Sequence, residues 1–400
     1  MRAVFFFLSC ICPVSALAKV SPPPPKLVKA WKLDPFYTKH LSVNGFPIIA
    51  SKNVSDHALR EAAYLIRNML GQRKDLLRAL VKNKVRFSII AHNEYTTDIP
   101  EHRRLQPRLF WNRRARGLGP SKDIPVVSCG EENLLNYPGD PYSTENILIH
   151  EFAHAIHSRA LSETDPTFDD RLKATHETAL KAGLWKGKYA GRNHHEYWAE
   201  GVQSWFGTNR EDDHDHNHVN TRAELEKYDP ALAKLVAEVF GKNDWQYQHP
   251  ADRQPASAHL KGFEPKAVPT FAWSAKANAW YQRYRKGLET LAPDHAVELE
   301  LLSPESENWR SPRTPHETEI FIANATGLTL HMEWIDFAGK AKVYGTLRPT
   351  GHFRQRTFAG HIWRISDAQT GQTLHYFITP KAPGQLVLKN LNKNAQDGKK

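Results

Sequence analysis

The stretch at residues 143–156, Ser-Thr-Glu-Asn-Ile-Leu-Ile-His-Glu-Phe-Ala-His-Ala-Ile, decides how the first half of the chain is interpreted. Its apolar residues recur at the spacing of one helix face, and Ser143 or Thr144 is a suitable N-cap, so the stretch predicts a helix. Within it His150 and His154 are four residues apart and share a face. Both imidazoles can therefore bind one zinc ion.

A catalytic zinc site needs a third protein ligand, and a second predicted helix offers one. Residues 193–200 read Asn-His-His-Glu-Tyr-Trp-Ala-Glu, and the first of them is the expected N-cap. Glu196 and Glu200 lie on one face of this helix, so we expect Glu196 to bind the metal and Glu200 to hold a ligating histidine by its other ring nitrogen. The reverse assignment of the two carboxylates stays open, as does ligation by His194 or His195.

These two motifs resemble those of the gluzincin metallopeptidases, and most closely the catalytic domain of the anthrax lethal factor type. That family pairs a His-Glu-x-x-His helix with a later helix whose first glutamate binds zinc, and it places a tyrosine seven residues before that glutamate. Tyr189 stands at this position here. The resemblance implies a zincin-like domain over residues 19–250, in which Glu151 activates the zinc-bound water and Tyr189 donates a hydrogen bond to the oxyanion.

A tract rich in acids and histidines follows the second motif. Residues 211–218 read Glu-Asp-Asp-His-Asp-His-Asn-His. Such a tract can bind a second metal ion, calcium or zinc, through the segment His214–His218. A solvated loop fits the same composition, and so does a cleft wall that selects basic substrate residues. All three interpretations stay open at this point.

The composition is that of a globular protein: 400 residues, 40% hydrophobic and 24% charged, with a formal charge of +11. It excludes a disordered tail, a coiled coil and a polytopic membrane protein. The basic residues are dispersed without a recognisable reader motif, so we expect no nucleic-acid partner. Residues 1–18 read as a cleavable signal peptide, too short for stable membrane insertion. We therefore expect a secreted protein, extracellular or periplasmic, in which Cys129 is a single buried thiol.

The last part of the chain follows a different pattern. From about residue 318 the hydrophobic period changes to two, with alternating runs such as 329–334 separated by turn residues. This pattern predicts an all-β module. It follows a connector, residues 251–308, that carries one helix with Trp280 and Tyr284 on the same face.

Residues 309–390 resemble the β domain of the von Hippel-Lindau tumour suppressor. The resemblance rests on four blocks, at residues 318–324, 334–339, 344–349 and 357–363. It implies a small β-sandwich that binds 4-hydroxyproline in an extended peptide, with aromatic side chains around the ring and hydrogen bonds to its hydroxyl group. Five residues coincide with the pocket positions of that family, and we call them the hydroxyproline pocket: Trp334, Tyr344, Thr357, His361 and Trp363. Thr357 stands where the family has serine.

The sequence thus predicts an α+β protein, with a mainly helical zincin-like domain, a connector, a small all-β sandwich and a basic tail at 391–400. We expect a secreted zinc metallopeptidase, an endopeptidase, whose β module binds proline- or hydroxyproline-rich material such as collagen-like protein. The alternative is a non-catalytic protein that binds hydroxyproline peptides and holds a structural zinc. An open coordination position and chelator-sensitive peptide cleavage distinguish the two.

Overall fold

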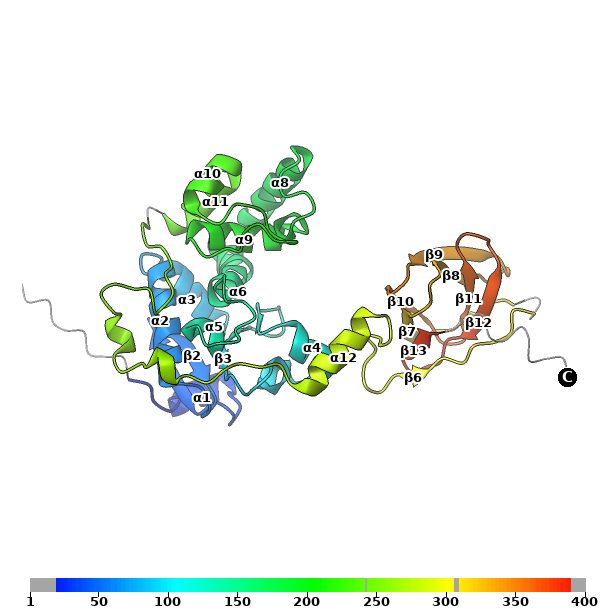
Figure 1. Ribbon diagram of the computed structural model, residues 1–400, viewed down its shortest axis with the longest axis horizontal. Coiled ribbons are helices and arrows are strands. Elements are labelled where there is room, and N and C mark those ends of the chain that lie inside the picture. Colours follow the sequence, from blue (N-terminus) through cyan, green and yellow to red (C-terminus); the bar gives the residue numbers. More distant parts are fainter. Residues whose placement is uncertain (1–18, 242, 306–308, 390–400) are drawn as a thin grey trace, which may run out of the picture. The chain divides into compact units, whose positions relative to one another are not determined.

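The computed structural model describes residues 19–241, 243–305 and 309–389, which form two compact units (Figure 1). The first unit contains the chain up to Tyr95 together with 99–101 and 116–272. The second contains 96–98, 102–115 and the chain from Trp273 onward. The expected signal peptide and basic tail lie outside the described residues.

A mixed five-stranded sheet lies in the first unit, in the order β1-β2-β3-β5-β4. The inner strands β2, β3 and β5 run parallel, whereas β1 and β4 are antiparallel to their neighbours. The strands are β1 (Lys39–Val43), β2 (Phe46–Ala50), β3 (Arg86–Ile90), β4 (Gly117–Leu118) and β5 (Val126–Gly130). Every residue of the three parallel strands is buried. Because such strands carry no polar alternation, β2 was not predicted. The expected α+β class is confirmed, and the first unit combines many helices with this small mixed sheet.

Three helices of the first unit begin at capping side chains, among them the predicted cap Asn193. The side chains of Ser55, Asn193 and Asp229 accept backbone N–H groups at the starts of α2 (Asp56–Leu70), α9 (His194–Trp205) and α11 (Pro230–Phe240). Each cap satisfies a donor that a helix N-terminus leaves unpaired.

Helix α6 (Ile147–Ala155) begins later than expected. Its cap is Asn146, whose Oδ1 accepts a hydrogen bond from Ile149 N at 3.1 Å, so the prediction of Ser143 or Thr144 was wrong. A π-helical turn, η3 (Ile156–Leu161), continues α6, which packs against α9. The other helices and turns of this unit are α1 (Pro25–Trp31), α3 (Lys74–Lys82), η2 (Pro100–His102), α5 (Glu131–Leu135), α7 (Ser162–Thr164), α8 (Phe168–Lys181), η4 (Tyr189–Gly191), α10 (Arg222–Tyr228), η5 (Ala258–Leu260) and η6 (Pro265–Ala267).

The first unit extends beyond its expected end at residue 250. Arg253 forms a buried ion pair with Glu61 of α2 at 2.6 Å, and its guanidinium lies 4.6 Å from the ring centroid of Tyr64. Phe271 N donates to Pro138 O at 2.8 Å. The compact first unit thus continues to Ala272. Cys129 is buried in β5, as expected.

The second unit contains a sandwich of two four-stranded sheets, with orders β10-β7-β13-β6 and β12-β11-β8-β9. Apolar residues of both sheets, including Ile320, Met332 and Trp363, form one core. The strands are β6 (Val297–Glu298), β7 (Glu317–Asn324), β8 (Leu330–Ile335), β9 (Ala341–Leu347), β10 (His352–Phe358), β11 (Ile362–Asp367), β12 (Thr373–Ile378) and β13 (Gly384–Leu388). The predicted all-β module is confirmed. It also includes β6, which lies within the residues expected to form the connector and pairs with β13.

The predicted connector helix is α12 (Ala275–Arg285), and it packs against α4 (Arg108–Arg114) in the same unit. The ring centroid of Phe110 lies 5.3 Å from that of Tyr284. Tyr284 also stacks on His352 of β10 at 4.0 Å, which joins the helix pair to the sandwich. The 3₁₀ turn η1 (Thr96–Asp98) also belongs to this unit. No described helix combines the length and the apolar content that crossing a membrane requires.

Candidate metal centre

Helices α6 and α9 bring the three predicted ligands together. His150 Nε2 and His154 Nε2 lie 3.2 Å apart, and Glu196 Oε2 lies 3.2 Å from the first and 3.3 Å from the second. The histidines come from successive turns of α6, and Glu196 comes from the first turn of α9. The three donor atoms form a nearly equilateral arrangement, which we call the donor triangle.

The donor triangle has the size that zinc requires. Zinc binds imidazole nitrogen and carboxylate oxygen at about 2.0–2.2 Å, and tetrahedral geometry then places neighbouring donors about 3.3 Å apart. Glu196 Oε2 is buried, and no described residue donates a hydrogen bond of good geometry to it. A cation would satisfy this acceptor. The residues present therefore fit the expected ion, and three protein ligands leave a fourth position for water or substrate.

The electrostatics of the centre favour positive charge. Burial by itself lowers the pKa of His150, but the carboxylates of Glu196, Glu151 and Glu200 raise it, with a net value of about 10. Burial raises the pKa of Glu196, but the imidazoles of His150 and His154 lower it by a larger amount. The net pKa of Glu196 is well below the usual range. A divalent cation would provide this charge in place of a proton.

Gln203 holds the second ring nitrogen of His150, a role that we expected for Glu200. His150 Nδ1 lies 2.7 Å from Gln203 Oε1 and 3.6 Å from Glu200 Oε1. Gln203 Nε2 in turn donates to Glu145 Oε2 at 3.2 Å, which fixes the orientation of the amide. The helical spacing carried a signal for Gln203, because a residue seven after Glu196 lies on the same face of α9.

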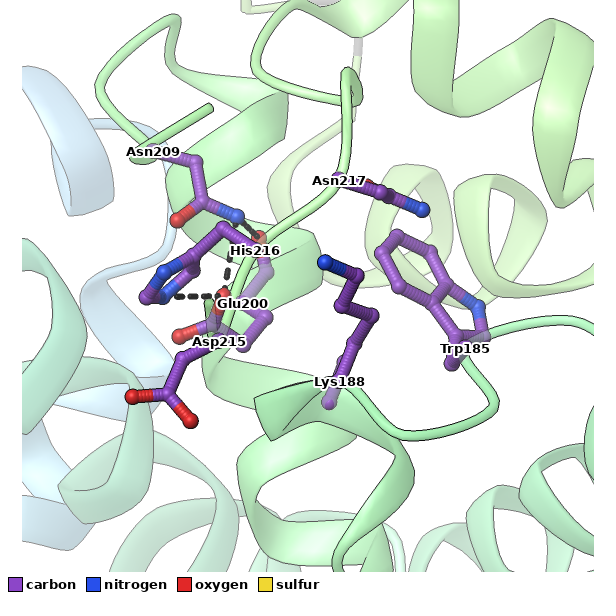
Figure 2. Close-up of a pocket in the computed structure, with 8 residues that line it drawn as sticks. Trp185, Lys188, Glu200, Asn209, Asp215, His216 and Asn217 are labelled. Carbon is purple, nitrogen blue, oxygen red and sulfur yellow. Dashed lines mark hydrogen bonds and ion pairs between the residues drawn. The ribbon is translucent and has the colours of Figure 1, made fainter. Parts of the chain in front are cut away.

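Glu200 joins α9 to the acidic and histidine-rich tract. Glu200 Oε2 lies 3.3 Å from His216 Nε2 and accepts a hydrogen bond from Asn209 Nδ2 at 3.0 Å (Figure 2). His216 is only 7% exposed, and its Nδ1 lies 2.9 Å from Asp213 Oδ1. The centre of the tract is therefore packed against α9 and is not simply a solvated loop. Among the described residues, neither of the two clusters with metal-binding geometry includes a residue of His214–His218.

The same tract positions Tyr189, which lies beside the candidate metal centre. The ring centroid of Tyr189 is 6.3 Å from that of His150 and 6.3 Å from that of His216. Its backbone N–H donates to Asp215 O at 2.7 Å, and the guanidinium of Arg192 lies 4.4 Å from its ring centroid. The structure thus places the tyrosine predicted from the motif next to a predicted ligand.

Glu151 and His154 face a glycine-containing segment that the sequence analysis missed. An added Cβ on Gly119 would lie 3.0 Å from His154 Cβ and 3.2 Å from Glu151 Oε2. An added Cβ on Gly117, in β4, would lie 3.3 Å from Glu151 Cγ. Strand β4 is the last in its sheet order, and these contacts place its backbone close to the candidate metal centre. The run Gly-Leu-Gly-Pro was the available signal, because glycine permits a close backbone approach.

The five residues of the predicted hydroxyproline pocket meet in the second unit. Trp334 and His361 stack with ring centroids 5.2 Å apart, and Tyr344 packs edge-on against Trp363 at 5.3 Å. Trp363 Nε1 donates to Thr357 Oγ1 at 3.3 Å, and this oxygen lies 3.3 Å from His361 Nδ1. Trp363 is 1% exposed and belongs to the core, whereas Tyr344 is 49% exposed. The cluster therefore reaches from the core of the sandwich to its surface.

Comparison with known proteins supports the assignment of this module. Residues 310–379 match the VHL beta domain family. The chain is 34% identical to Protein Vhl of Drosophila melanogaster over 59 residues, which are 15% of this chain and 33% of that protein. The chain thus spans about a third of the curated relative that it matches. The second unit accordingly contains a VHL β domain, as the sequence blocks predicted.

Proposed function

We propose that this chain is a zinc-dependent metallopeptidase. The observation that carries the proposal is the donor triangle of His150, His154 and Glu196, whose spacing fits tetrahedral zinc. Glu151 follows His150 directly and lies beside the segment at Gly119. A structural zinc site is normally closed by four protein ligands, whereas three ligands next to a carboxylate are typical of a catalytic site.

In this proposal each side chain has a defined role. When bound, zinc supplies a Lewis acid and a nucleophile made from water at neutral pH. The carboxylate of Glu151 accepts a proton from the attacking water and passes it to the leaving amine. The hydroxyl group of Tyr189 donates a hydrogen bond to the peptide carbonyl oxygen as negative charge develops there. Gln203 holds His150 in the orientation that ligation needs.

The position of β4 supports an extended peptide as substrate. This strand pairs with β5 on one side and is the last strand of the sheet on the other. An extended peptide can add to such an edge through main-chain hydrogen bonds. Since Gly117 and Gly119 lie against Glu151 and His154, a peptide bound there would run past the metal centre.

The substitution Glu151→Gln tests the proposal. It removes the proton acceptor but none of the proposed ligands, so we expect unchanged zinc content and a loss of peptide cleavage of about 10²-fold to 10⁴-fold. Zinc is measured by mass spectrometry and cleavage with a peptide library. The control Glu177→Gln changes an exposed carboxylate of α8 and should leave both unchanged. Retained turnover in Glu151→Gln would refute the assignment.

We also propose that the β module binds hydroxyproline in an extended peptide, which makes collagen-like or other hydroxyproline-rich proteins outside the cell the substrate class. The grouping of aromatic rings around Thr357 and His361 supports this, because aromatic faces pack a pyrrolidine ring and the two polar groups can bind its hydroxyl. Export of the chain belongs to the same proposal and rests on residues 1–18.

Calorimetric titration of the full chain with matched proline and hydroxyproline peptides tests the binding proposal. We expect Tyr344→Ala to weaken hydroxyproline binding by about tenfold or more, which corresponds to about 1.4 kcal/mol. The control Val343→Ala changes a neighbouring side chain that is 56% exposed and should have no effect. Equal affinity for the two peptides would show that the module does not recognise the hydroxyl group.

A further inference from the structure

A second cluster of potential metal ligands lies one helical turn beyond the donor triangle. It consists of His157, Asp169 and His195, and one donor atom from each lies within 4.8 Å of the others. His157 Nε2 lies 3.0 Å from Asp169 Oδ1, and the Nδ1 atoms of His157 and His195 are 3.4 Å apart. None of the three belongs to the proposed catalytic site.

We propose that His157, Asp169 and His195 bind a second zinc ion, which links the helical segments that carry them. Two imidazoles and one carboxylate form a donor set that zinc accepts. One donor atom from each residue lies within 4.8 Å of the others, so small side-chain movements would bring the three around one ion. This inference does not depend on peptidase activity, because it concerns a different set of ligands.

The ion would connect three helical segments. His157 lies on the π-helical turn η3, Asp169 in the first turn of α8 and His195 in the first turn of α9. The turn η3 continues α6, which carries His154, and His195 directly precedes Glu196. A metal ion bound at this cluster would therefore fix the two helices of the donor triangle relative to each other.

The cluster has one buried ligand, which packs against aromatic rings, and two ligands that are accessible to solvent. His157 is 3% exposed, and its ring centroid lies 5.8 Å from that of Phe168 and 6.4 Å from that of Trp198. His195 is exposed, and the Asp169 side chain is 42% exposed, so an ion can enter from solvent.

Two neighbouring side chains compete for the same carboxylate. Lys173 Nζ lies 2.6 Å from Asp169 Oδ2, and His194 Nε2 lies 3.1 Å from Asp169 Oδ1. Because of this competition and the exposure of the ligands, the second site is expected to bind zinc more weakly than the donor triangle. It should therefore fill second in a titration.

Zinc titration of the full chain, with bound metal counted by mass spectrometry, tests the proposal. We expect two equivalents in the unmodified chain and one in both His195→Gln and Asp169→Asn. Asp169 lies on α8, away from the donor triangle, so Asp169→Asn separates loss of the second site from disturbance of Glu196. Circular dichroism confirms that each variant is folded, and cobalt absorption gives an independent count of sites.

Three further variants make the result decisive. His150→Ala should keep one equivalent, and His150→Ala combined with Asp169→Asn should keep none. His214→Gln changes a side chain that is 93% exposed in the acidic tract and should keep two. One equivalent in the unmodified chain, or two in Asp169→Asn, would overturn the second site. If His150→Ala keeps both equivalents while Asp169→Asn loses one, the catalytic proposal fails and the second site stands.

Discussion

At the scale of single residues, Gly119 shows how close the backbone comes to the proposed catalytic groups. A side chain at this position would meet both His154 and Glu151 at distances that real Cβ contacts rarely show. The residue does not have a left-handed backbone conformation, so space and not torsion angle is the reason for glycine here. The absence of a side chain is what leaves room beside the donor triangle.

We expect Gly119→Ala to lower peptide cleavage by between about tenfold and 10²-fold, because displacing reacting groups by a fraction of an ångström has effects of this size. Zinc content should change little, since the added methyl group contacts Cβ of His154 and not its ligating nitrogen. Gly327→Ala is the control, as nothing lies within 4 Å of the added atom there. Equal activities of the two variants would show that Gly119 has no part in the site.

At the scale of elements, the candidate metal centre depends on where α6 and α9 begin and on how they pack. Asn193 Oδ1 accepts hydrogen bonds from the backbone N–H groups of His195 and Glu196 at 2.9 and 3.0 Å. The cap thus holds the very turn that carries Glu196. Trp198 Nε1 donates to Ala153 O at 2.9 Å, which fixes α9 against α6.

Replacing this cap should affect stability and metal binding together. Asn193→Ala is expected to cost about 1 kcal/mol of unfolding free energy, measured with urea, and to weaken zinc binding in a chelator competition. Asn193→Asp keeps a side-chain acceptor at the same position and should preserve both. Normal zinc affinity in a destabilised Asn193→Ala chain would show that zinc binding does not depend on this cap.

At the scale of the whole molecule, the two units have separate apolar cores. The donor triangle and the second cluster both lie in the first unit, and the VHL β domain lies in the second. Metal binding should therefore stabilise one unit and leave the other unchanged.

Calorimetry of the full chain with and without chelator tests this expectation. A ligand at about 100 times its Kd stabilises the folded state by about 2.7 kcal/mol, so the chelator should lower the Tm of the first unit. Ile320→Val, a core change in the sandwich, should lower the Tm of the second unit alone and so identify its transition. A chelator effect on that second transition would contradict the independence of the units.

The local features were predictable because they depend on neighbours in sequence. The helix spacing of His150 and His154, the cap at Asn193 and the β pattern of the module all follow from residues within a few positions of each other. Strand β2 and the segment at Gly119 were not predictable in this way. The first is uniformly apolar, and the second acquires its role only from helix α6, about thirty residues later in the chain.

The sequence by itself determined the three donors of the triangle, the neighbouring Glu151 and Tyr189, and the VHL β domain. These features depend on side-chain chemistry and on spacing along the chain, and both can be recognised from the order of the residues. The tertiary structure decided which partner each donor has. It placed Gln203 and not Glu200 on His150, packed His216 against Glu200, and brought Asp169 to His157 and His195. Contacts between separate helices depend on how those helices pack, and no local pattern specifies that packing.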